Sequence, residues 1–170
     1  RLVVLCGSVN PISCNQMDYG EQRGYRRVHI PADRLLSGGK FNTGSDAMMM
    51  DYLWTLYCQT PYLMIDSLQT GREQVLLGTE ELSLEDIRQK ISCQMGRILK
   101  ELIDRGADAC FMIIGGDTLL AFMDSIGCHE LTPVCELQPG VVLSRIGDGG
   151  REYELMSKSG GFGAEVLLVT

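Results

Sequence analysis

The sequence predicts an α/β domain with a mainly parallel sheet flanked by helices and a late β-hairpin. Short apolar runs alternate along the chain with longer segments of helical periodicity, as in folds built from strand–helix–strand units. Residues 109–116, ACFMIIGG, are apolar at every position, which is typical of a strand buried on both faces. The Gly-Asp-Gly-Gly turn at residues 147–150 separates two strand-like runs and predicts the hairpin.

Strands are expected where a short apolar or alternating run ends in glycine or polar turn residues. The predicted strands cover residues 1–8, 25–30, 72–79, 109–116, 132–146 and 151–158. Residues 61–71 fit a strand or a helix, so the sequence leaves this segment open.

Helices are expected where a cap residue precedes helical periodicity. They cover residues 10–24, 45–57, 84–105 and 117–127, with at most one further helical turn between residues 31 and 44. Asn10 is a favourable N-cap and Pro11 suits the first helical position. The clearest helix is 84–105, because Ser83 caps it and apolar residues recur every three or four positions. We expect this helix to have a structural role only, and the methionines at 48–50 to fill the core.

Length and composition place the chain among ordinary globular domains. Its 170 residues suffice for one domain with a sizeable core, and 45% of them are hydrophobic. The net charge of −7 argues against binding to nucleic acid or to an anionic membrane, because both require a basic face. No apolar run is long enough to span a bilayer. The chain begins with Arg1 and enters an apolar run at once, so we expect it to be a piece of a longer protein.

The seven cysteines indicate free thiols in a reducing compartment. Their number is odd, the sequence has no Cys-x-x-Cys pair, and most of them lie within apolar runs. We therefore expect buried, unpaired cysteines and a cytoplasmic protein. His29 and His129 are far apart and have no partner at metal-ligand spacing, so we expect both to be structural.

Three turns share one arrangement, in which a strand leads through small polar residues towards a helical segment. They are Gly7-Ser8-Val9-Asn10, Gly115-Gly116-Asp117-Thr118 and Lys158-Ser159-Gly160-Gly161-Phe162-Gly163. In open α/β sheets ligands bind at the carboxyl ends of strands, where a helix N-terminus offers free N–H groups and partial positive charge to phosphate. For any single turn, a cap at Asn10 or Thr118 or a solvated Lys158 is the simpler interpretation. Three such turns together favour an anion or nucleotide site.

Two familiar nucleotide motifs are absent from the sequence. There is no Gly-x-x-x-x-Gly-Lys-[Ser/Thr], so the chain is not a P-loop protein. There is also no Gly-x-Gly-x-x-Gly after a strand, which argues against a dinucleotide-dependent oxidoreductase.

Four segments, taken in order, resemble the C-terminal nucleotide-binding domain of the four-carbon acid sugar kinases. They read CGSVNPISCNQ, IIGGDTLLAF, ELQPGVVLSR and KSGGFG, and the resemblance covers nearly the whole chain. It departs from the family at Asn10, Ser13 and Val142, where the family usually has Ser, Thr and Pro. Kinases of this family act on erythronate, threonate or 3-oxo-tetronate. Their N-terminal domain holds the sugar acid and their C-terminal domain holds ATP.

The resemblance implies that residues 1–170 form the ATP-binding domain of such a kinase, inactive without the sugar-acid domain as its partner. The nucleotide-binding residues that it implies are Ser8, Gly115, Gly116, Asp117, Thr118, Lys158, Ser159, Gly160, Gly161 and Gly163. The glycines would give phosphates backbone donors and room, and Lys158 would add charge. Asp117 is either a direct or water-mediated Mg²⁺ ligand or a helix cap, and the sequence leaves both open. The catalytic base is unknown and is expected on the sugar-acid domain.

A second hypothesis comes from another functional class. A non-catalytic, ligand-sensing module could have kept the same nucleotide fold, although the intact glycine turns favour the kinase. The sequence identifies neither the acid sugar nor the oligomeric state, so a homo-oligomer stays open.

Overall fold

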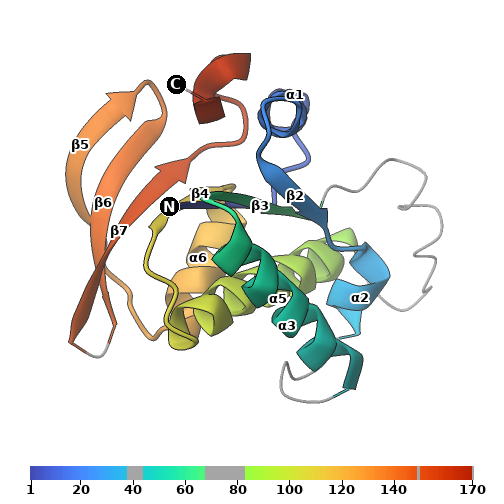
Figure 1. Cartoon of the computed structure of the whole chain (residues 1–170). Helices are drawn as coiled ribbons and strands as arrows, with labels where there is room; N and C mark the ends of the chain where they lie inside the picture. The colour runs from blue at the N-terminus through green and yellow to red at the C-terminus, as the bar shows by residue number, and fades with distance from the viewer. Residues whose placement is uncertain (38–43, 68–82, 149, 170) are drawn as a thin grey trace.

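A seven-stranded sheet runs through the molecule in the computed structural model, which describes residues 1–37, 44–67, 83–148 and 150–169 (Figure 1). The strands are β1 Leu2–Cys6, β2 Arg26–His29, β3 Tyr62–Asp66, β4 Cys110–Ile114, β5 Thr132–Gln138, β6 Val141–Asp148 and β7 Arg151–Lys158. Their order in the sheet is β2-β3-β1-β4-β7-β6-β5. The first five strands in this order pair in parallel, and β6 and β5 join antiparallel. The predicted fold class is therefore confirmed.

Helices cover both faces of the sheet (Figure 1). They are α1 Pro11–Gln22, α2 Ala32–Leu36, α3 Gly44–Gln59, α5 Leu84–Asp104, α6 Gly116–Ser125 and the 3₁₀ helix η1 Glu165–Val169. Helices α3, α5 and α6 pack on one face, and α1 with η1 packs on the other. Each face of the sheet has its own hydrophobic core, and alternate residues of β1 pack into the two cores. Val3 and Leu5 belong to the core under α3, α5 and α6, and Val4 and Cys6 belong to the core under α1 and η1.

The open segment 61–71 contains β3, which lies between β1 and β2 and is buried from Leu63 to Asp66. The strand predicted over 72–79 lies outside the described residues. The predicted strand 132–146 consists of two strands, β5 and β6, because the chain turns between them at Gly140 with a φ of 78°. The late hairpin of β6 and β7 is confirmed.

Membership of an apolar run did not reliably predict burial. Met49 and Met50 lie in the core as expected, but Met48 is 73% exposed because α3 turns it away from the sheet. All seven cysteines are free, as predicted, and Cys6 is fully buried. Its burial raises the pKa of the Cys6 thiol to about 12. The expectation of burial is wrong for the cysteines on the exposed faces of α3, α5 and β5, which are Cys58, Cys93 and Cys135.

Both histidines lie beside carboxylates. His29 Nδ1 is 2.8 Å from the buried Asp66, and His129 is 4.0 Å from Asp124. In the described ranges, no group of three His, Cys, Asp or Glu side chains is placed to hold a metal ion. None of the helices described is long and apolar enough to cross a membrane.

Helix α5 crosses α6 at very short range, and Gly96 permits this approach. A Cβ atom at Gly96 would lie 2.6 Å from the backbone nitrogen of Phe122 and 2.7 Å from the carbonyl carbon of Ala121. This crossing holds the N-terminal half of α5 beside the first turn of α6. It thereby brings α5 to the edge of the sheet where β1, β4 and β7 end.

Candidate nucleotide-binding site

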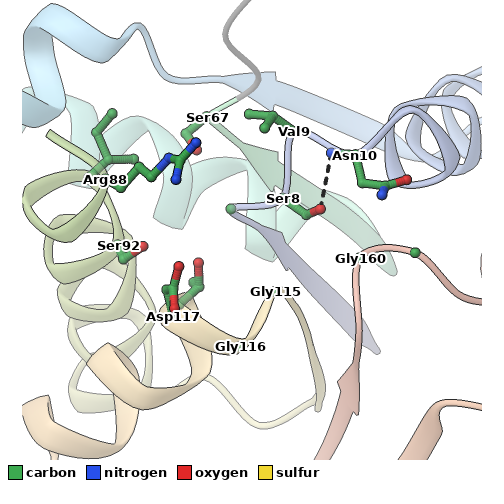
Figure 2. A pocket seen from close by; sticks show the side chains of 14 residues that line it. Ser8, Val9, Asn10, Ser67, Arg88, Ser92, Gly115, Gly116, Asp117 and Gly160 are labelled. Atoms are coloured by element: carbon green, nitrogen blue, oxygen red, sulfur yellow. Dashed lines mark hydrogen bonds between the residues drawn. The ribbon is translucent and has the colours of Figure 1, made fainter. Parts of the chain in front are cut away.

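The carboxyl ends of β1, β4 and β7 lie together, as parallel strands require. Gly7 N donates to Ile114 O at 3.1 Å, and Gly115 N donates to Lys158 O at 3.0 Å, so the three predicted turns are joined side by side. A cavity of about 480 Å³ opens above them (Figure 2). Its walls come from the three turns, from Ser67 after β3, and from α5.

The turn into α1 satisfies its own backbone groups. Asn10 is the N-cap, and its Oδ1 accepts from Ile12 N at 2.9 Å. Pro11 has no N–H to offer, and Asn10 N donates to Ser8 Oγ at 3.2 Å. The predicted cap at Asn10 is therefore confirmed, and this turn leaves few donors for a ligand.

The turn into α6 is built differently. Gly115 is the N-cap, with a φ of 114° and no side-chain cap. The backbone N–H groups of Gly116, Asp117 and Thr118 therefore lack partners within the helix, and the helix dipole adds partial positive charge beside them. A Cβ atom at Gly116 would meet nothing within 4 Å, so the cavity begins directly above this residue.

Two side chains of this turn also face the cavity. Thr118 is 1% exposed, and within the described part of the chain its hydroxyl makes no hydrogen bond. Among the described residues, Gln16 Oε1 is the one buried side-chain polar atom without a hydrogen bond, so the Thr118 hydroxyl reaches the cavity surface, where a ligand or water can satisfy it. The carboxylate of Asp117 is exposed and lines the same cavity (Figure 2).

The loop after β7 contributes Gly160 and Gly161 to the cavity wall. Its charged residue, Lys158, does not line the cavity. Lys158 is 3% exposed, and its Nζ donates to Ser159 O at 3.0 Å and to Gly160 O at 3.4 Å. Burial lowers the pKa of this lysine. The interpretation of Lys158 as a solvated surface residue is wrong, and its ammonium is not part of the cavity lining.

Close packing holds this loop against the turn into α1. Ser13 Oγ donates to Gly160 O at 2.8 Å, and a Cβ atom at Gly160 would lie 2.2 Å from Ser8 Oγ. Gly163 has a φ of 88° and lies against Gln16, whose Nε2 donates to Phe162 O at 3.2 Å and to Ala164 O at 2.8 Å. The glycines of this loop thus include residues that shape it as well as residues that face the cavity.

Helix α5 forms the opposite wall of the cavity, a placement that the expectation of a structural role only did not include. Arg88, Ile91 and Ser92 all line the cavity. Figure 2 shows Arg88 and Ser92 on this wall. The signal for this was present, because Arg88, Ser92 and Gly96 are four residues apart and share one ridge of the helix. No local motif marks that ridge as part of a site.

Seven of the ten predicted nucleotide-binding residues meet at this cavity. They are Ser8, Gly115, Gly116, Asp117, Thr118, Gly160 and Gly161. The other three, Lys158, Ser159 and Gly163, belong to the supporting loop and do not line it. The role of each residue in nucleotide binding stays a prediction.

A family model described as a nucleotide-binding C-terminal domain matches residues 3–168. This chain belongs to that family. A search of curated proteins found no match. The nucleotide-binding domain is thus identified over almost its full length, in agreement with the predicted kind of domain.

Solved structures with the same fold belong to longer chains. A Bordetella bronchiseptica domain of unknown function, DUF1537, was solved with bound citrate as a domain-swapped dimer. It is 20% identical with a TM-score of 0.74, and the match covers 99% of this chain and 37% of the Bordetella chain. A Haemophilus influenzae protein of DUF1537 is 16% identical with a TM-score of 0.72, over 97% of this chain and 38% of the other. The nucleotide-binding domain thus spans less than two-fifths of these relatives.

Proposed function

We propose that this domain is the ATP-binding half of a kinase that phosphorylates a hydroxyl group of a four-carbon acid sugar. The family supports nucleotide binding, and the resemblance of the four sequence segments supports the kinase and its substrate class. The observation that carries the proposal is the uncapped N-terminus of α6, with its free N–H groups and the unbonded Thr118 hydroxyl at the cavity.

The phosphates of ATP fit the turn at Gly115 and Gly116. Free N–H groups and the positive end of a helix dipole stabilise anions, and the missing side chain at Gly116 lets a phosphate approach the backbone closely. The turn into α1 closes the cavity on the other side, where Ser8 and Asn10 line it. The local site is therefore suited to an anion even though the chain carries a net charge of −7.

Asp117 suits a magnesium ion that accompanies the nucleotide. Mg²⁺ keeps several waters and takes oxygen ligands from phosphates, so one or two carboxylates are enough to hold it. Asp117 brings a carboxylate to the cavity from the same first turn of α6 that carries the proposed phosphate position. When bound, the ion would neutralise charge on the transferring phosphate. The alternative role of Asp117 as a side-chain cap finds no support, because the α6 N-terminus has no side-chain cap hydrogen bond.

The transfer itself needs little covalent chemistry from this domain. The hydroxyl oxygen of the sugar acid bonds to the γ-phosphorus, the bond from that phosphorus to the β,γ-bridging oxygen breaks, and ADP leaves. The hydroxyl proton passes to a base that we place on the sugar-acid domain. The nucleotide-binding domain positions the phosphates and supplies hydrogen-bond donors to them.

Calorimetry with ATP and Mg²⁺ tests nucleotide binding by the chain, with circular dichroism to verify that it is folded. We expect saturable binding of ATP and ADP. Absence of a binding signal from the folded chain at millimolar nucleotide would overturn the nucleotide site.

Kinase activity is tested on the longer protein, by ATP consumption that depends on an added tetronate. We expect turnover there and none from the 170-residue chain. Turnover by the chain alone would contradict the two-domain proposal, and nucleotide binding without turnover in the longer protein would favour the sensing module.

A further inference from the structure

A nucleoside triphosphate carries several negative charges, and backbone N–H donors alone rarely compensate all of them. In many phosphate sites an arginine or lysine completes the set. Lys158 is the cation that the sequence offers for this purpose. In the structure its Nζ is directed inward to Ser159 O, Gly160 O and Ser13 Oγ, at 3.0, 3.4 and 3.5 Å.

Arg88 lies on the opposite wall of the cavity. Its guanidinium extends from α5 into the cavity, towards the strand ends that carry Ser8 and Ser67 (Figure 2). The side chain is exposed, and within the described ranges it makes no hydrogen bond or ion pair. Other arginines differ from it, because Arg27 and Arg105 are each held by carboxylates.

The backbone beneath Arg88 is firmly placed. Its neighbours on the helix, Ile87 and Ile91, are 8% and 7% exposed and anchor α5 in the core. The crossing at Gly96 fixes the distance of this helix from α6. Ser92, one turn after Arg88, is buried and faces the same cavity, where it adds a hydroxyl group.

We propose that Arg88 is the cation that binds the phosphate chain of the nucleotide, while Lys158 acts as a positioning residue for the loop after β7. This inference rests on the proposed nucleotide site. A guanidinium donates two parallel N–H groups to two phosphate oxygens, which suits a group that reaches across a cavity towards an anion held by backbone donors. Lys158 instead binds the carbonyl groups of the loop and so keeps Gly160 and Gly161 in the cavity wall.

The test is a calorimetric titration of the folded chain with MgATP, MgADP, AMP and adenosine. The variants are Arg88→Met, Arg88→Lys and Lys158→Met. The charge-matched control is Arg23→Met, at the end of α1 that lies away from the cavity. We expect Arg88→Met to lower ATP affinity about 10- to 100-fold and to leave adenosine binding unchanged. Arg88→Lys should recover part of the loss, and the control should bind ATP like the native protein.

Lys158→Met should change ATP and adenosine affinity by the same factor, because a shifted loop does not distinguish them. Native ATP affinity in Arg88→Met, or a loss confined to ATP in Lys158→Met, would overturn the inference and leave the nucleotide site intact. Failure of the folded native chain to bind any nucleotide would instead overturn the proposed function. In the longer protein, a raised KM for the sugar acid with unchanged ATP affinity would place Arg88 on the acid substrate and contradict the inference.

Discussion

The turns into α1 and α6 follow the same order of strand, small polar residues and helix. They differ in whether the backbone N–H groups at the helix N-terminus have a hydrogen-bond acceptor. At α1, Asn10 caps Ile12 and Pro11 has no N–H, so the turn is satisfied internally. At α6, the N-cap residue Gly115 has no side chain that could accept a hydrogen bond, so the first turn presents its N–H groups to the cavity. Similar local sequences therefore give one turn whose donors are satisfied internally and one turn whose donors face the cavity, where we propose that phosphate binds. The identity of the N-cap residue makes the difference.

The turn into α6 also depends on a neighbour, α5, in a way that the turn into α1 does not. Gly96→Ala would place a Cβ 2.6 Å from the backbone nitrogen of Phe122 and force the two helices apart. We expect the free energy of unfolding to fall by about 3 kcal/mol, the upper part of the usual range for overpacking. Urea unfolding measures the change. The control is Gly116→Ala, whose Cβ has open space, and equal stability of the two variants would contradict the close crossing.

Gly116→Val tests whether the α6 turn is a binding turn. The branched side chain would occupy the space where a phosphate approaches the N–H groups. We expect ATP affinity to fall about 10- to 100-fold, or roughly 1.4 to 2.7 kcal/mol. Calorimetry measures the affinity and Gly116→Ala should give a smaller loss. If circular dichroism shows an unfolded variant, Gly116 is a residue of backbone geometry and its assignment to binding is wrong.

Asn10→Ala tests the structural turn. Removal of the cap leaves Ile12 N without its side-chain acceptor, and we expect a loss of about 1 kcal/mol in the free energy of unfolding. Asn10→Ser should retain most of the stability, because serine also caps well. Thermal or urea unfolding decides the matter. A fall in ATP affinity as large as that of Gly116→Val, with no loss of stability, would reverse the roles assigned to the two turns.

The smallest expected effect concerns the pH dependence that Lys158 adds to the loop beside both turns. Burial lowers its pKa from the ordinary 10.5, so between the lowered value and 10.5 the unfolded chain holds a proton that the native chain lacks. Stability therefore rises with pH across this window. We expect the free energy of unfolding of the native protein to rise relative to that of Lys158→Met as pH approaches 10.5. Parallel curves in urea unfolding would show that Lys158 is not buried in solution.

Most of the fold was predictable because its signals are local. The apolar run at 109–116, the cap at Ser83 and the helical periodicity after it depend on neighbouring residues, and β4 and α5 follow them closely. Segment 61–71 was ambiguous because a short apolar run fits two structures. Residues 62–66 of this segment form β3 because they pair with both β1 and β2, and that pairing is a long-range property.

For the candidate site, the sequence by itself determined the glycine turns, the cap at Asn10 and the placement of three strand ends at one edge of a sheet. Seven of the ten predicted residues line the cavity for that reason, since parallel strands bring their carboxyl ends together. Only the tertiary structure decided which basic side chain faces the cavity. Lys158 follows a strand directly and was the obvious candidate, yet burial turns it towards loop carbonyls. Arg88 reaches the cavity because α5 and α6 cross at Gly96. No local sequence pattern predicts where two helices cross.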